Sequence, residues 1–404
     1  MSYSIHEFIT GQQMRSSPTM SAGNMAKEAE ARGLQVDVVT VGDLFPKPPT
    51  DMTEGWLKQL HADAAKPENK SNPVFALRPD AKLYAYSETT GLPSFRAAVA
   101  QCFTRDTGLS AAAAEVMVGT GGKGALNGAL FNSVKAGDVV ILAAPGWPTN
   151  YDMFPTGVKL VEVATGDGIL RADVLSEVLK TYPNPAMILI NAPCNPTGAN
   201  YTAPEREAFF GVVLSDTKTT LVASDDPYGK LVYTQEAYDI RTILQRGENE
   251  KKLHEAARLA TFRTVSKEYG LAGERVGFVV TKNPTMLQSL QRWNENKGGG
   301  MGVQNQLLAQ AALMYGDDFI AGAVALLKQK RALLVDGIAA LRFATVNAPM
   351  GTIYGWVNFS GLKGKTVPTN LSETNAAYVI QTPADMMRYL VNVAGVCGVS
   401  GTPF

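Results

Sequence analysis

Short, almost wholly apolar runs alternate with longer amphipathic stretches through the middle of the chain. Apolar runs without polar alternation are typical of strands buried on both faces of a parallel sheet. The strands expected from this pattern cover 115–119, 137–145, 159–164, 186–193, 219–226, 258–267 and 275–281. The helices expected between them cover 123–134, 149–154, 171–182 and 203–216. The pattern therefore predicts an α/β fold, with a mostly parallel sheet as the middle of three layers.

The two ends of the chain have a different pattern. A long helical run without strand signals covers 300–342, and strand-like runs follow at 345–360 and 391–404. The glycine-rich stretch at 297–302 is the strongest break before them. We therefore predict a large domain over 50–295 and a smaller α+β domain built from 1–49 and 296–404.

Composition narrows the class of protein. The chain has 404 residues, of which 45% are hydrophobic, and its 37 Lys and Arg equal its 37 Asp and Glu. A zero balance gives no support to nucleic acid or an anionic membrane as a partner. The 3 cysteines are too few for a disulfide framework. Neither a secretory signal nor a run of about 20 apolar residues is visible, so we expect a soluble, cytoplasmic protein.

A glycine-rich turn, "VMVGTGGKGALNGAL" at 116–130, suggests an anion site. Gly119, Gly121 and Gly124 have the G-x-G-x-x-G spacing of a dinucleotide-binding turn, but no acidic residue ends the next strand, "ILAAPGW". A P-loop is excluded because Lys123 is followed by glycine. What remains is either a tight turn without a ligand or free backbone amides that bind an anion at a helix N-terminus.

Three further stretches carry polar residues near predicted strand ends: "APCNPTGANY", "ASDDPYGKLVY" and "TVSKEYGLAGERVGFVV". Alone, each has an ordinary explanation as a turn, a helix cap or a solvated lysine. Together, in this order and after the glycine turn, they resemble the fold type I pyridoxal-phosphate (PLP) enzymes of the class I/II, aspartate aminotransferase-like family. The resemblance extends over essentially the whole chain and implies PLP as the cofactor.

The resemblance implies a role for each residue that contacts the cofactor ring. Lys267 would form a Schiff base with the cofactor aldehyde and shuttle a proton. Asp225 would face the pyridine nitrogen and keep the ring protonated. Asn195 and Tyr228 would hydrogen-bond the phenolic oxygen, and Trp147 would stack on the ring. Lys267, Asp225 and Tyr228 are the expected catalytic residues.

The cofactor phosphate would be held from two sides. Gly121, Gly122 and Lys123 supply the turn, with Lys123 matched mainly through its backbone. Ser266 and Arg275 would lie opposite, and arginine suits a bidentate grip on a phosphate. No metal site is expected.

Tyr86, in "YAYSETTGLPSFR", matches a family tyrosine that reaches the neighbouring subunit's phosphate. This match implies a homodimer with active sites at the interface. The alternative for Tyr86 is simple core packing.

Several departures from the family pattern concern the substrate pocket. The family's arginine for the substrate α-carboxylate lies beyond the segment matching "GVSGTPF", where this chain stops at Phe404, and Arg388 does not match it. Either the chain is cut short or the anchor is absent. Gly146 replaces a bulky residue, "DDPY" replaces "DEIY", and the glycines at 298–302 suggest room for a larger substrate.

The expected activity is amino-group transfer between an amino acid and a 2-oxo acid. The alternative is PLP-dependent elimination, replacement or C–C bond formation, with S-adenosylmethionine or another bulky substrate. A binding protein that has kept the fold without catalysis and a nicotinamide enzyme are weaker hypotheses. The substrate side chain stays open, because only cofactor residues match specific motifs.

Overall fold

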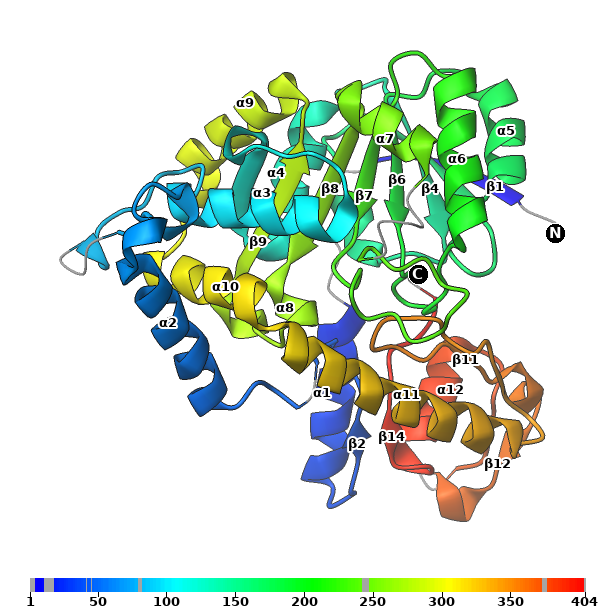
Figure 1. Ribbon diagram of the computed structural model, residues 1–404. Helices are drawn as coiled ribbons and strands as arrows, with labels where there is room; N and C mark the ends of the chain where they lie inside the picture. Colours follow the sequence, from blue (N-terminus) through cyan, green and yellow to red (C-terminus); the bar gives the residue numbers. More distant parts are fainter. Residues whose placement is uncertain are drawn as a thin grey trace.

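The computed structural model describes residues 4–10, 18–40, 42–44, 46–78, 82–241, 247–372 and 376–402. A large three-layer body carries a smaller part at one end (Figure 1). The helices are α1 (Pro18–Ala31), α2 (Thr50–Ala65), α3 (Pro93–Thr107), α4 (Gly121–Ser133), α5 (Ala172–Thr181), α6 (Ala203–Asp216), α7 (Glu248–Glu255), α8 (Val265–Glu268), α9 (Pro284–Trp293), α10 (Val303–Tyr315), α11 (Asp317–Ala339) and α12 (Pro383–Asn392).

The strands form one large sheet and three short pairs. The large sheet contains β1 (Ser4–Ile9), β3 (Val116–Thr120), β4 (Val139–Ala144), β5 (Lys159–Ala164), β6 (Met187–Asn191), β7 (Leu221–Asp225), β8 (Leu259–Thr264) and β9 (Val276–Thr281). Its order is β1-β5-β4-β6-β7-β8-β9-β3, and the run from β5 to β8 is parallel. The predicted α/β fold with a mostly parallel sheet is therefore confirmed.

Both faces of this sheet are buried, which explains the continuous apolar runs. In β6, Ile188 and Ile190 belong to one core while Met187 and Leu189 belong to the other, as the alternation of side chains along a strand requires. The first core also includes side chains of α3, α5, α6 and α10, and the second includes those of α4 and α9. The helices seen on the two sides of the sheet in Figure 1 thus complete the three layers.

Two predicted elements end earlier than expected. The strand predicted over 258–267 stops at Thr264, whose side chain accepts a hydrogen bond from the Ser266 amide and starts the one-turn helix α8. The helical run predicted over 300–342 is broken at Gly316, between α10 and α11. A Cβ there would lie 2.6 Å from the Ala312 carbonyl oxygen, so the chain turns only because this residue is glycine.

The smaller part joins segments from both halves of the sequence. Its strands are β2 (Asp37–Val38), β10 (Thr345–Val346), β11 (Val357–Asn358), β12 (Thr366–Val367), β13 (Tyr378–Val379) and β14 (Val396–Cys397). β2 pairs with β14 in parallel, and Ala22 and Ala26 of α1 share a small core with Val391 of α12. The boundaries predicted at 50 and 295 stay a prediction, while β1 lies at the edge of the large sheet.

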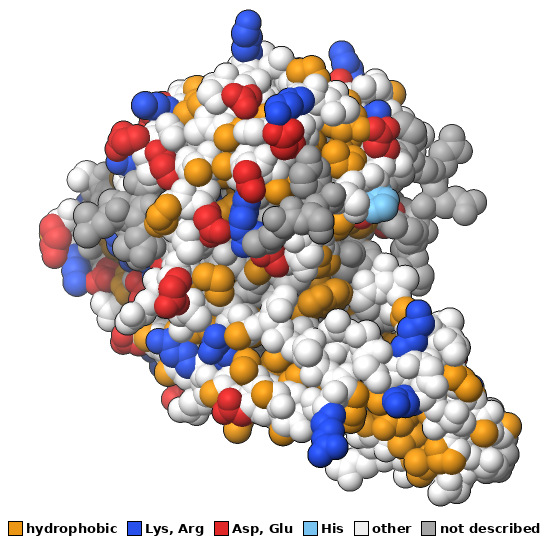
Figure 2. All heavy atoms as spheres, turned by 90° about the vertical axis from the view of Figure 1, so that its right-hand side faces the viewer, with side chains coloured by type: hydrophobic (Ala, Val, Ile, Leu, Met, Phe, Trp, Pro, Cys, Tyr) orange, Lys and Arg blue, Asp and Glu red, His pale blue; other side chains and the backbone are white. Residues whose placement is uncertain are grey.

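Two properties of the surface and the helices bear on partners. On the face shown in Figure 2, basic and acidic side chains are interspersed over the large body, as the equal numbers of the two charges suggest. Within the described ranges, no helix combines the length and the apolar character needed to cross a membrane.

Candidate active site

The topology brings most of the predicted site residues to one edge of the large sheet. β4, β6, β7 and β8 run parallel, and β3 runs in the same direction because both β3 and β8 are antiparallel to β9. The carboxyl ends of these strands therefore share one edge, where ligands of such sheets bind. The predicted site residues lie at or near strand ends on this edge, and they are Gly121, Gly122, Lys123, Trp147, Asn195, Asp225, Tyr228, Ser266, Lys267 and Arg275.

The glycine turn lies against Arg275 at the start of α4. Gly121 has a φ of +69°, and its amide donates to the Arg275 carbonyl at 2.6 Å. A Cβ on Gly121 would come within 2.5 Å of the Arg275 guanidinium, so only glycine lets the two groups approach. The first amides of a helix have no intrahelical partner. Together with a guanidinium they fit a phosphate, so the donor set suits the cofactor phosphate.

Ser266 lies beside this turn on α8. Its hydroxyl accepts a hydrogen bond from the Thr264 hydroxyl at 2.8 Å, and both side chains are buried. A Cβ on Gly122 would meet the Thr264 side chain at 3.3 Å, which places the start of α4 next to α8. The Thr264 hydroxyl also donates to the Val276 carbonyl at 2.7 Å, so it links Ser266 to the start of β9 beside the glycine turn.

Lys267 is the central residue of α8, and its amine donates a hydrogen bond to the Gly42 carbonyl. Burial lowers the pKa of Lys267, and the nearby cations Lys47, Arg275 and Lys123 lower it further, while Asp43 opposes them. An amine acts as a nucleophile only in its neutral form, so this environment favours reactivity.

Asp225 ends β7 and is almost fully buried. Burial, with a further contribution from Asp226, raises its pKa to about 8. The Asn191 side-chain amide donates to the Asp225 backbone carbonyl at 2.7 Å and lies 3.5 Å from its carboxylate. The same Asn191 side chain accepts from the Asn195 amide at 2.7 Å, so it joins the ends of β6 and β7.

Tyr228 and Asn195 converge on one hydroxyl group, that of Tyr354. The Tyr228 and Tyr354 hydroxyl oxygens are 2.7 Å apart, and the Asn195 amide nitrogen lies 3.5 Å from Tyr354. Tyr354 comes from the segment before β11, more than a hundred residues from either partner. Asn195 and Tyr228 thus meet at one hydroxyl group, and sequence reasoning missed this third member.

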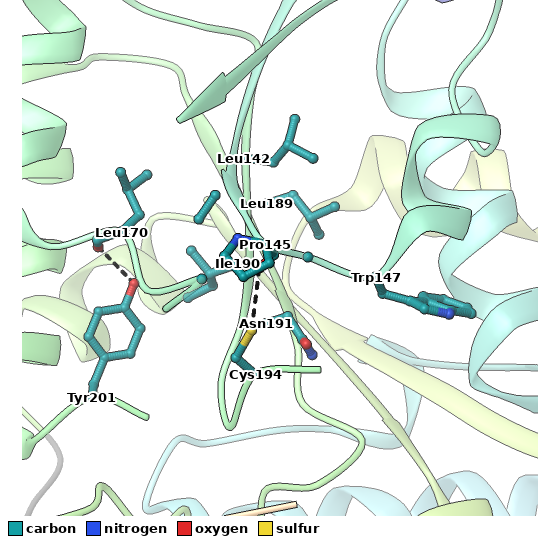
Figure 3. Close-up of a pocket in the computed structure, with 12 residues that line it drawn as sticks. Leu142, Pro145, Trp147, Leu170, Leu189, Ile190, Asn191, Cys194 and Tyr201 are labelled. Atoms are coloured by element: carbon teal, nitrogen blue, oxygen red, sulfur yellow. Dashed lines mark hydrogen bonds between the residues drawn. The ribbon is translucent and has the colours of Figure 1, made fainter. Parts of the chain in front are cut away.

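Trp147 follows β4, and the Lys123 amine lies 5.0 Å from the centre of its ring. Burial and the charge of Arg275 lower the pKa of Lys123. A cavity of about 20 Å³ lies beside these residues, lined by Pro145, Cys194 and Tyr201 among others (Figure 3). This cavity has room for about one water molecule, and in Figure 3 Trp147 points away from Tyr201 across it.

Two of the glycines that suggested a larger pocket have a structural reason instead. A Cβ on Gly146 would lie 2.8 Å from the Ala143 carbonyl oxygen. A Cβ on Gly300 would lie 2.8 Å from both the backbone and the side-chain oxygen of Ser87. These close backbone approaches account for glycine at both positions without a bulky substrate.

Tyr86 lies apart from this edge and is 98% exposed, with the neighbouring Tyr84 also exposed. The Arg78 guanidinium donates to the Tyr86 carbonyl at 2.7 Å and to the Glu88 carboxylate at 2.9 Å. This arrangement orders the loop while its tyrosine ring projects outward. Core packing, the alternative for Tyr86, is therefore wrong.

Sequence reasoning missed three residues that the fold places in the site: Gly42, Asn191 and Tyr354. Asn191 could have been found, since it lies near the end of the strand predicted over 186–193, four positions before Asn195. Gly42 and Tyr354 had no comparable signal, because their segments reach the site only through tertiary contacts.

A lysine, a buried carboxyl group and a glycine-rich anion site at the carboxyl edge of a three-layer α/β fold define the PLP-dependent transferases of fold type I. Solved structures agree on the fold. The aspartate aminotransferase from Rhizobium meliloti matches with a TM-score of 0.77 and 24% identity, over 97% of this chain and 92% of that one. The Thermus thermophilus aspartate aminotransferase with maleate matches with a TM-score of 0.75 and 20% identity, over 96% of this chain and 90% of that one.

Sequence comparison shows the family. Residues 50–402 match the family described as "Aminotransferase class I and II". The aspartate/prephenate aminotransferase of Cereibacter sphaeroides (strain ATCC 17029 / ATH 2.4.9) is 30% identical over 358 residues, 88% of this chain and 82% of its own length. A probable aspartate/prephenate aminotransferase of Rhizobium leguminosarum bv. phaseoli is 27% identical over 396 residues, 97% of this chain and 90% of its own.

The chain belongs to the class I and II aminotransferase family. It is a PLP-dependent enzyme that moves an amino group between small molecules, an amino acid and a 2-oxo acid. The expected family, cofactor and activity are confirmed. The comparisons favour transfer over the elimination or replacement reactions that the sequence left open.

Proposed function

We propose that Lys267 carries the cofactor and moves the proton during amino-group transfer. The observation that carries this proposal is the lowered pKa of an amine at the carboxyl edge of the sheet, produced by burial and by neighbouring cations. PLP supplies an electron sink for the substrate's Cα. A base whose pKa is brought toward neutral pH exchanges a proton with such a carbon most effectively.

The other site residues bind and orient the cofactor. Asp225, with its raised pKa, holds a proton at the ring nitrogen. Asn195 and Tyr228 donate hydrogen bonds to the phenolic oxygen, and Trp147 packs on the ring. The amides of Gly122 and Lys123 would bind the phosphate from the start of α4, while Gly121 shapes the turn through its bond to the Arg275 carbonyl, and Ser266 and Arg275 would complete the shell.

The amino donor in this proposal is a dicarboxylic amino acid such as aspartate. Curated relatives carry the name aspartate/prephenate aminotransferase. The side chain of Lys123 supports the same choice, because its pKa is lowered by burial and by the charge of Arg275. A second substrate carboxylate beside Lys123 would offset both effects.

The test compares aspartate and alanine as donors to 2-oxoglutarate, with products identified by mass and the cofactor spectrum recorded. We expect kcat/KM for aspartate to exceed that for alanine by about 10-fold or more. Lys123→Met is expected to lower kcat/KM for aspartate by about 10- to 100-fold and that for alanine by less than about 3-fold. An equal loss for both donors contradicts the role of Lys123, and release of an elimination product contradicts the transfer reaction itself.

The active unit in this proposal is a homodimer. Tyr86 supports it, since an aromatic ring that is 98% exposed on an ordered loop is suited to contact a second chain. From that position its hydroxyl would reach the neighbour's phosphate. Sedimentation of wild type and Tyr86→Phe is expected to show dimers for both, with weaker cofactor retention in the variant; a monomeric, fully active wild type contradicts the proposal.

The proposed location is the cytoplasm. Cys102, Cys194 and Cys397 are all free and buried. Burial raises the pKa of Cys102 and of Cys194 to about 11, so these thiols stay protonated and unreactive. Such thiols suit a reducing compartment.

A further inference from the structure

The hydroxyl of Tyr354 contacts two residues of the proposed cofactor site directly. Its oxygen lies 2.7 Å from the Tyr228 hydroxyl and 3.5 Å from the Asn195 side-chain nitrogen. The two tyrosine rings cross at 78° with centroids 5.6 Å apart. We propose that Tyr354 is a further positioning residue of the reaction, which acts through Tyr228 by directing that hydroxyl's proton to the cofactor's phenolic oxygen. This inference rests on the proposed roles of Tyr228 and Asn195.

The Tyr228–Tyr354 hydrogen bond can run in either direction, and the proposal assigns Tyr354 as its donor. Each tyrosine hydroxyl carries one proton and can also accept. The Asn195 amide group only donates at its nitrogen, so the Tyr354 oxygen accepts from it. The Tyr354 proton is then available to donate to Tyr228, which would leave the Tyr228 proton for the phenolic oxygen. A donor that itself accepts a hydrogen bond is strengthened by cooperativity.

Both hydroxyls stay protonated in this environment. Burial raises the pKa of Tyr228, and the contact with Tyr354 and the Asp225 carboxyl raise it further. Burial likewise raises the pKa of Tyr354, with Asp43 and Asp225 as the carboxyl groups that face it and the contact with Tyr228 opposing them. Two neutral hydroxyls can therefore form a directed chain rather than compete as anions.

The backbone holds Tyr354 in place from the segment before β11. Thr352 has a φ of +72°, its amide donates to the Leu231 carbonyl at 2.9 Å, and its hydroxyl accepts from the Tyr354 amide at 3.1 Å. The Tyr233 hydroxyl donates to the Gly351 carbonyl at 2.6 Å. The chain after β7 thus anchors the segment three residues or fewer from Tyr354.

Gly42 leaves the space that the Tyr354 hydroxyl occupies. A Cβ on Gly42 would overlap that hydroxyl, so no other residue fits there without moving the ring. The carbonyl of the same Gly42 accepts from the Lys267 amine. Tyr354 therefore lies over the same short backbone segment that contacts the reactive lysine.

The experiment measures the pH midpoint of the visible-absorbance change of the PLP-loaded enzyme in the absence of substrate. A hydrogen bond donated to the phenolic oxygen stabilises its negative charge, so the neighbouring proton on the Lys267 nitrogen is lost more easily. Tyr228→Phe is expected to raise the midpoint by about 1 to 2 pH units. Tyr354→Phe is expected to raise it by about 0.3 to 0.6 pH unit, since it weakens that bond without removing it.

Two further variants separate positioning from a structural effect. In the Tyr228→Phe background, adding Tyr354→Phe is expected to change the midpoint by less than about 0.1 pH unit, because the Tyr228 hydroxyl through which Tyr354 acts is already absent. Tyr233→Phe removes an anchor of the same segment and is expected to leave the midpoint unchanged. An equal shift in Tyr233→Phe, or no shift in Tyr354→Phe while Tyr228→Phe shifts, overturns the inference. No shift in Tyr228→Phe overturns the proposed role of Tyr228 and, with it, the role of Tyr354.

Discussion

Two lysines, the fully buried Lys230 and the partly buried Lys267, lie in opposite electrostatic surroundings. The Lys230 side chain is fully buried, and its amine lies 2.9 Å from the Asp106 carboxylate and 3.2 Å from that of Asp317. The Lys267 amine faces the neutral carbonyl of Gly42. One lysine is thus enclosed by counter-ions, and the other lies among further cations.

The pKa values of the two lysines shift in opposite directions. Burial alone lowers the pKa of both amines. For Lys230, the neighbouring Tyr269 and Asp106 outweigh burial and raise the pKa overall. For Lys267, the nearby cations act in the same direction as burial. Burial therefore does not decide whether a lysine is charged; the signs of its neighbours do.

The ion-paired cluster around Lys230 also supports the helix that carries Lys267. Glu268 follows Lys267 directly, and its carboxylate accepts from the Lys230 amide at 2.9 Å and from the Arg263 guanidinium at 2.8 Å. Because α8 has only one turn, these bonds hold it where its own helical bonds cannot. The ion-paired cluster thus fixes the helix from which Lys267 projects.

Replacing the reactive lysine is expected to have the largest effect. Lys267→Ala removes the group that carries the cofactor and the proton, so kcat should fall by about 1,000-fold or more. Its melting temperature should stay within about 2 °C of wild type, since burial and the neighbouring cations oppose the charge of the lost amine. Activity assays and thermal melts check both. Loss of folding in Lys267→Ala would remove the contrast between the two lysines.

Replacing the paired lysine is expected to destabilise the fold instead. Lys230→Met removes the closer of the two cations beside one oxygen of the buried Asp106 carboxylate, while Arg105 stays at 2.7 Å from the other oxygen, so the free energy of unfolding should fall by about 2 to 4 kcal/mol. Denaturant unfolding measures this. Lys251→Met is the matched control, since its pair with Glu248 lies at the surface, and its loss should stay below about 0.5 kcal/mol. Equal effects of the two variants would show that the buried pair adds no more to the free energy of unfolding than the surface pair does.

The smallest effect is expected from Asp225, a second buried group without a counter-ion. Its folded-state pKa of about 8 lies above the ordinary value of 3.8, so the folded protein binds a proton that the unfolded chain releases. The stability that this bound proton contributes is fully present below the ordinary pKa, and it is lost as the pH rises through the pKa of the folded protein. Cofactor-free wild type should lose about 2 kcal/mol relative to Asp225→Asn between about pH 6 and 8.

Unfolding free energies of the two proteins across this pH range check the prediction. Parallel curves would show that Asp225 ionises normally despite its burial. Adding PLP should remove the difference in slope, because the ring nitrogen then shares the proton that Asp225 holds.

Local pattern was enough for most of the large sheet and for the residues at its edge. Ile188 and Leu189 point to different cores, so the run around them is apolar without a break and easily recognised. Lys267 and Arg275 lie within one short motif, and the order of its residues along the chain indicates the family. The strand β1 and the break at Gly316 were not predicted, because both depend on what the segment packs against.

The sequence by itself determined the fold class and, through the family resemblance, the cofactor, and it predicted the residues that would contact this cofactor, since each is encoded by neighbouring positions along the chain. Only the tertiary structure decided the electrostatic state of these residues. Whether Lys267 is reactive, Asp225 protonated or Tyr228 held by Tyr354 depends on charges and hydroxyls from distant segments. Electrostatic interactions and hydrogen bonds depend on distance in space, which spacing along the chain does not set.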